Sequence, residues 1–119
     1  MKKLNEFQDL SVWQKSHNFV LEIYKLSKSF PTEEKFGLIQ QMRRAAVSIP
    51  ANIAEGFKRK GIKDKIHFYN IAQGSLQELR YYLILGKDLK YISDSNLLWS
   101  STDEIGKMLN GLIKSIGRR

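Results

Sequence analysis

The chain has 119 residues, of which 42% are hydrophobic and 27% are charged, and its formal net charge at pH 7 is +8. This length predicts one domain with a single core, spanning residues 1–119, and the apolar content excludes a disordered chain. The sequence contains no cysteine, which excludes disulfides, cysteine–zinc sites and thiol catalysis.

Three short interruptions divide the chain into four segments whose apolar residues recur with the period of a helix. The segments are about 11–29, 33–58, 63–90 and 95–117. Thr32 is the expected N-cap of the second segment, because Glu33 and Glu34 follow it where a helix dipole favours negative charge. No segment keeps the alternation of a strand. The pattern predicts an all-α fold, an antiparallel up-down-up-down four-helix bundle with short loops.

The inward faces of these helices are predicted from the apolar rows. Phe68 is also expected in the core, because it opens the apolar row of the third segment. The residues expected to be largely buried are Leu38, Met42, Ile49, Ile53, Leu76, Leu79, Leu83, Leu109 and Leu112.

Pro50 lies inside the second segment, where it removes one backbone hydrogen bond. One interpretation is a kinked helix, and the other is a break in which Ser48 caps a shorter helix from Ile49. The kink is favoured, because the apolar row continues through Ile49, Ile53 and Phe57 without losing phase.

Polar residues lie directly beside the core row of the second segment. Ser48, Asn52 and Glu55 are spaced i, i+4, i+7, which places them on one helix face. Such a polar row predicts a hydrogen-bonded seam between helices or between subunits. The residues expected in this seam are Arg43, Arg44, Ser48, Asn52 and Glu55, with Ser75 and Glu78 from the third segment.

Half of the 20 Lys and Arg residues are expected near one end of the bundle. There the second loop meets both termini, including Lys2, Lys3 and Lys114. This basic end predicts binding to nucleic-acid phosphates with little sequence readout, and Phe57, Phe68 and Tyr69 lie near enough in sequence to stack on bases. A solvated loop with basic tails is the alternative. The residues predicted to bind are Lys58, Arg59, Lys60, Lys63, Lys65, Arg118 and Arg119.

No residue pattern indicates catalysis, a metal or a cofactor. Asp64 and His67 form one isolated D-x-x-H pair, whereas di-iron bundles need carboxylates on all four helices. The run from Gly56 to Gly61 lacks the Lys-Ser or Lys-Thr pair of a phosphate-binding loop. The chain is therefore predicted not to be an enzyme. It has neither the apolar core of a signal peptide nor a run of 18 apolar residues, so a cytoplasmic protein without a membrane span is expected.

Several sequence words resemble a known family. QMRRAAVSIPANIAEGFKR and HFYNIAQGSLQELRYYLILGKDLKYI, with flanking segments from about Phe7 to Ile116, look like the bacterial 23S rRNA intervening-sequence proteins, also labelled S23-type ribosomal proteins. That family is similar in turn to the accessory variability protein of diversity-generating retroelements. The resemblance implies a four-helix protomer, a homopentameric ring, and, in the retroelement relative, binding of nucleic acid and a reverse transcriptase.

In this family context, Arg43 or Arg44 is expected to pair with Glu55 or Glu78, within one protomer or across two. Such pairs fix register more than they stabilise. Two hypotheses for function follow. The first is a non-enzymatic, oligomeric accessory protein that binds RNA or DNA with little sequence specificity. The second is an interaction scaffold that docks a partner, such as an RNA-processing or reverse-transcribing enzyme.

Overall fold

The computed structural model describes residues 5–118 and consists of four long helices joined by short connections. They are α1 (Ser11–Ser27), α2 (Leu38–Lys58), α3 (Ile62–Asp88) and α4 (Asn96–Gly117), with the single-turn 3-10 helices η1 (Phe7–Asp9) and η2 (Thr32–Glu34). The described residues contain no strand. The predicted all-α class and the number of helices are thus confirmed.

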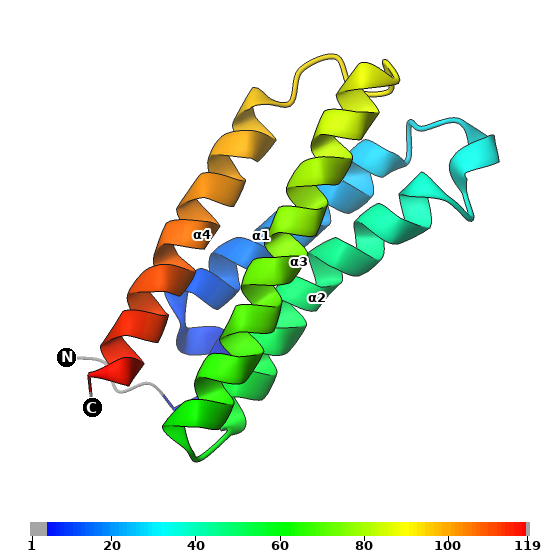
Figure 1. Cartoon of the computed structure of the whole chain (residues 1–119). Coiled ribbons are helices and arrows are strands. Elements are labelled where there is room, and N and C mark those ends of the chain that lie inside the picture. Colours follow the sequence, from blue (N-terminus) through cyan, green and yellow to red (C-terminus); the bar gives the residue numbers. More distant parts are fainter. Residues whose placement is uncertain (1–4, 119) are drawn as a thin grey trace.

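The helices form an elongated body of 47 × 25 × 20 Å. Figure 1 shows the chain path reversing at each of the three connections between the long helices. Each helix packs against its neighbours in sequence, α1 also packs against α4, and α2 and α3 share the most extensive contact. The end of α2, the start of α3 and the end of α4 consequently lie at the same end of the body (Figure 1).

The core consists of the inward faces of all four helices. Eight of the nine residues predicted to be buried are so, and Leu112 is half-buried against the same core. The prediction for Phe68 was wrong: its neighbour Tyr69 takes the core position and Phe68 is only half-buried. The inward row of α3 runs Tyr69, Ala72, Leu76, Leu79, and Phe68 lies one residue, about 100°, to the side of it.

The start of α2 differs from the prediction. The helix begins at Leu38 rather than at residue 33, and Thr32 does not cap it. Glycine is a poor helix former, and Gly37 separates η2 from α2. The first turn is capped by Glu34, whose Oε1 accepts a hydrogen bond from the backbone N–H of Leu38 at 3.3 Å. Glu34 Oε2 also accepts one from the hydroxyl of Tyr91 at 3.0 Å, which ties this corner to the α3–α4 connection.

Pro50 lies inside α2, which continues as one helix from Leu38 to Lys58. The alternative of two helices separated at Ser48 is therefore wrong. The ring of Pro50 is buried. Whether the helix axis bends at this residue stays a prediction. Within the described chain, no helix has both the length and the apolar character needed to cross a membrane.

Candidate nucleic-acid interface

The predicted basic residues of the described chain gather at one end of the bundle. Lys58, Arg59 and Lys60 close α2 and form the connection, and Lys63 lies in the first turn of α3. Lys114 and Arg118 are at the end of α4, which Figure 1 shows at the same end of the molecule. All six side chains are exposed. Arg119, also predicted to bind, and Lys2 and Lys3 lie outside the described residues.

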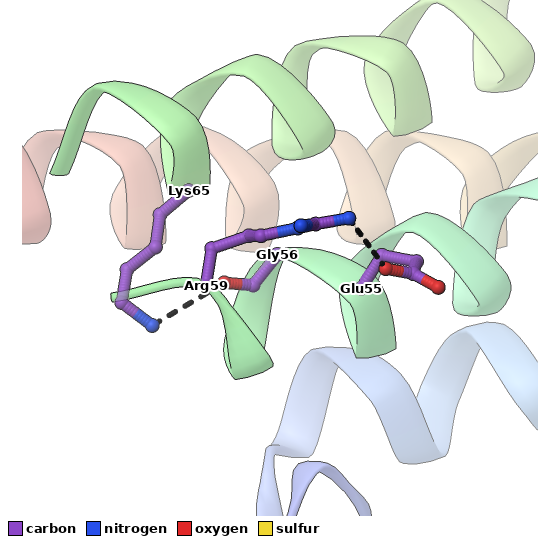
Figure 2. Close-up of polar contacts among 4 residues, drawn as sticks. All are labelled: Glu55, Gly56, Arg59 and Lys65. Carbon is purple, nitrogen blue, oxygen red and sulfur yellow. Dashed lines mark hydrogen bonds and ion pairs between the residues drawn. The ribbon is translucent and has the colours of Figure 1, made fainter. Parts of the chain in front are cut away.

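Two members of this basic end are held by the protein itself. The Nζ of Lys65 donates hydrogen bonds to the carbonyls of Gly56 at 3.2 Å and Phe57 at 2.7 Å. Lys65 therefore caps the C-terminus of α2, where the helix dipole attracts a cation. Arg59 pairs with Glu55, with 3.2 Å between Nη2 and Oε2 (Figure 2). By contrast, the side chains of Lys58, Lys60 and Lys63 make no hydrogen bond or ion pair with another described residue.

The three aromatic residues near this end differ in their accessibility. Tyr69 is only 1% exposed, so it cannot stack on a base without unfolding, and that part of the prediction was wrong. The ring of Tyr69 fills the space beside Gly56. Because this glycine has no side chain, α2 and α3 pack closely at this point. Phe68 and Phe57 are half-buried, and each has a cation over its ring: the guanidinium of Arg59 lies 4.7 Å from the Phe68 centroid, and the Nζ of Lys65 lies 5.6 Å from that of Phe57.

The uncharged members of the polar row connect α2 to α3. Ser48 and Ser75 share a hydrogen bond of 2.7 Å between their hydroxyl oxygens. The amide of Asn52 donates to the hydroxyl of Ser48 at 2.9 Å and to its carbonyl at 2.8 Å. This short network satisfies polar groups beside the core, and it joins the two helices that share the most extensive contact.

The predicted Arg–Glu pairs do not form within one chain. Arg43 turns to α1: its Nε donates to the hydroxyl of Ser27 at 2.8 Å, and its Nη2 donates to the carbonyl of Tyr24 at 3.3 Å. The two acids have partners four residues further along the chain. Glu55 pairs with Arg59, just after the end of α2, and Glu78 accepts a hydrogen bond from Tyr82 on α3. Pairing between protomers stays a prediction.

Arg44 and Glu55 are both exposed in the single chain. The large cost of an unpaired buried charge therefore does not apply to them there. An effect of Arg44→Ala or Glu55→Ala is expected on an assembly, and not on the fold of one protomer.

The hydrogen bond between Tyr82 and Glu78 leads to a testable pH effect. Tyr82 donates to Glu78 at 2.6 Å, and this bond together with partial burial raises the pKa of Tyr82 to about 12. The neutral phenol is thus favoured in the folded state, so this bond stabilises the fold fully below about pH 10 and is lost as the pH rises through about 12.

We expect Glu78→Gln to lower the pKa of Tyr82 toward the ordinary value of about 10. The measurement is an absorbance titration of phenolate, in which the variant ionises one more tyrosine than the parent midway between those two values. Tyr82→Phe, which removes the titrating group, identifies the signal. Superimposable titrations of the parent and Glu78→Gln would contradict the assignment.

The structure also contains a groove that the sequence pattern did not indicate. It lies between α1 and α2 beside η2, with a volume of about 590 Å³. Its apolar lining comes from Tyr24, Phe36, Ile39 and Val47. Tyr24 lines the groove from α1, and 38% of it is exposed. In the sequence, the groove is indicated only by the width of the apolar rows of these two helices, which is more than one neighbouring helix can cover.

Among the described residues, no cluster of three or more His, Asp or Glu side chains could hold a metal ion. His17 stacks on Trp13 with 5.1 Å between ring centroids, and His67 contacts Phe68 edge-on at 5.3 Å. Both histidines therefore pack against aromatic rings and do not belong to a group of metal ligands.

Comparisons with known proteins match most of the chain. Residues 8–111 match the family described as 23S rRNA-intervening sequence protein. A crystal structure from Bacteroides thetaiotaomicron, described as a protein with unknown function from the S23 ribosomal protein family, is 33% identical, with a TM-score of 0.79. The match covers 87% of this chain and 98% of that one. No curated protein matches the chain. Neither match names an enzyme.

Proposed function

We infer a function for this chain from the family to which it belongs, the 23S rRNA-intervening sequence proteins, and from the chemistry of its surface. We propose that it is a non-enzymatic accessory protein that binds RNA or DNA through the basic end of the bundle, with little sequence specificity. The observation that carries the proposal is that exposed Lys and Arg side chains from α2, α3 and α4 gather at one end. The similarity to the retroelement accessory protein stays a prediction.

The proposed mode of binding depends on which Lys and Arg side chains at the basic end already have partners within the protein. Lys58, Lys60 and Lys63 are available to neutralise phosphates, with Lys114 and Arg118 beside them. Lys65 acts indirectly, because its hydrogen bonds to Gly56 and Phe57 hold the connection in place. Lysine contacts to phosphate carry no sequence information. Stacking of an unpaired base on the Arg59–Phe68 pair would add affinity with similar tolerance of sequence.

We further propose that the protein is a homo-oligomer, with the pentamer as the expected form. The surface expected between protomers is the stripe on α2 and α3 formed by Arg44, Ser48, Ser75 and Glu78. These side chains line a hollow of about 220 Å³, which a neighbouring protomer could fill. Repeated basic ends in one assembly would multiply weak phosphate contacts through avidity.

The proposal predicts strongly salt-dependent binding. Five available cations imply a slope of log affinity against log salt of about −3 to −4 for one protomer on single-stranded RNA, and a steeper slope for an assembly. Fluorescence anisotropy with a labelled RNA at several salt concentrations measures it, with a scrambled RNA of equal length as control. Sedimentation gives the mass, which is a multiple of 13.8 kDa in any oligomer.

A slope near zero would contradict the phosphate mechanism, and a monomer mass at every concentration would contradict assembly. The second candidate function, an interaction scaffold, is favoured by the apolar groove between α1 and α2. Binding of a protein partner there would be largely insensitive to the charges of the basic end.

A further inference from the structure

The groove between α1 and α2 concentrates exposed apolar surface. Phe36 is 81% exposed and Val47 is 41% exposed, while Tyr24 and Ile39 complete the apolar lining of the same hollow. Single exposed hydrophobic residues are ordinary on protein surfaces, but several around one groove mark an interaction site.

The rim of the groove is cationic. Lys35, Arg43 and Arg44 line it, and among the described residues that line it none is Asp or Glu. The side chain of Arg44 is exposed and makes no hydrogen bond or ion pair with another described residue. The lining of the groove therefore carries a net positive charge, which favours a negatively charged occupant.

Arg43 is held in place before any ligand arrives. Its guanidinium stacks 4.5 Å from the centre of the Tyr24 ring, and it donates to Ser27 and to the carbonyl of Tyr24. These two bonds use two of the five N–H donors of an arginine, which leaves donors for a carboxylate. A side chain fixed in this way loses little entropy on binding, which increases the affinity that each contact supplies.

We propose that this groove docks an acidic amphipathic segment of a partner protein. Apolar side chains of the segment occupy the lining formed by Phe36, Ile39 and Val47, and its carboxylates bind Lys35, Arg43 and Arg44. This is the helix-in-groove mode of peptide recognition. The apolar lining favours a peptide over a nucleic acid, whose phosphates would leave that surface exposed.

The groove is separate from the basic end. The lining of the groove reaches Ser48 and α2 ends at Lys58, so ten residues of helix, about 15 Å, separate the two sites. The two surfaces can therefore be tested independently, and a failure of nucleic-acid binding says nothing about this groove.

The test uses a short fluorescein-labelled helical peptide with leucines on one face and glutamates on the other. We expect it to bind the full chain, while a control peptide with lysine in place of every glutamate does not. Phe36→Ser removes an exposed anchor and is expected to weaken binding about tenfold or more, the size expected for an anchor that contributes more than about 1.4 kcal/mol. Lys35→Glu, at an exposed residue that lines the groove and lies outside the stripe expected between protomers, should weaken it by a similar factor through charge reversal.

Leu97→Ser is the matched control, because Leu97 is 86% exposed at the start of α4 and does not line the groove. It should bind the acidic peptide as the parent does, as should the variant in which Lys58, Lys60 and Lys63 become glutamate. Absent binding of the acidic peptide, equal binding of the basic one, or equal losses in Leu97→Ser and Phe36→Ser would overturn the proposal.

Two further outcomes assign the groove to another occupant and also overturn the proposal. If Phe36→Ser lowers the mass of the assembly in sedimentation, a second copy of the chain covers the groove. If a labelled RNA loses affinity on Phe36→Ser and competes with the acidic peptide, the groove belongs to the nucleic-acid surface.

Discussion

Replacing Lys58, Lys60 and Lys63 together by glutamate is expected to weaken RNA binding about 100-fold or more at about 0.15 M salt. Each phosphate contact contributes about 0.7–0.9 to the slope of log affinity against log salt, which at this salt corresponds to about four- to fivefold in affinity per contact. Three lost contacts multiply to about 100-fold, and the introduced negative charges add repulsion. The slope itself should fall in magnitude by about 2–3.

These three lysines are the informative choice because the fold does not use them. Arg59 and Lys65 have internal partners in Glu55 and in the carbonyls at the end of α2, so replacing either would disturb the connection as well as the charge. The measurement is anisotropy with labelled RNA, together with circular dichroism to verify that helicity is unchanged.

The control is the triple reversal of Lys25, Lys28 and Lys87, which changes the net charge by the same amount away from the basic end. It should retain most of the affinity. If both triple variants lose affinity equally, only the overall charge matters. If neither loses affinity, the basic end is a solvated loop and the scaffold function becomes the better explanation.

Gly56→Ala is expected to destabilise the fold by about 1–3 kcal/mol, the usual cost of inserting a methylene into a filled core. A Cβ at this position would lie 2.6 Å from Cε1 and 2.9 Å from Cδ1 of Tyr69. The Tyr69 ring is 1% exposed, so it has no open space into which to move. The contact would force α2 and α3 apart beside the basic end, where Gly56 also supplies a carbonyl to Lys65.

Gly74→Ala is the matched substitution, since a Cβ at this exposed helical glycine meets nothing within 4 Å. It should stabilise the protein by about 0.5–1 kcal/mol through the higher helix propensity of alanine. Urea unfolding of both variants measures the free energies of unfolding. Adding Tyr69→Leu to Gly56→Ala should recover part of the loss in a double-mutant cycle. Equal stabilisation by both alanines would show that the Tyr69 contact relaxes without cost.

Much of the fold could be predicted because a helix repeats its environment every 3.6 residues. Leu76, Leu79 and Leu83 must share one helix face, and an apolar face has to be covered. Eight of the ten residues predicted for the core, all except Leu112 and Phe68, are accordingly buried. The neighbouring choice between Phe68 and Tyr69 could not be made from spacing. Both fit an apolar row to within one residue, and the gap left by Gly56 on the facing helix admits the ring of Tyr69.

The sequence by itself determined the four helices, the family, and the gathering of basic residues near the second connection. Only the tertiary structure decided what each polar group contacts. Lys65 binds the end of α2, Arg43 binds the end of α1, and Glu34 accepts a hydrogen bond from the hydroxyl of Tyr91. Position along a helix fixes the direction in which a side chain leaves the axis, but a hydrogen bond also needs an acceptor at about 3 Å, and that acceptor comes from a segment distant in sequence. For the same reason the groove beside Phe36 appears only when α1 and α2 are packed together.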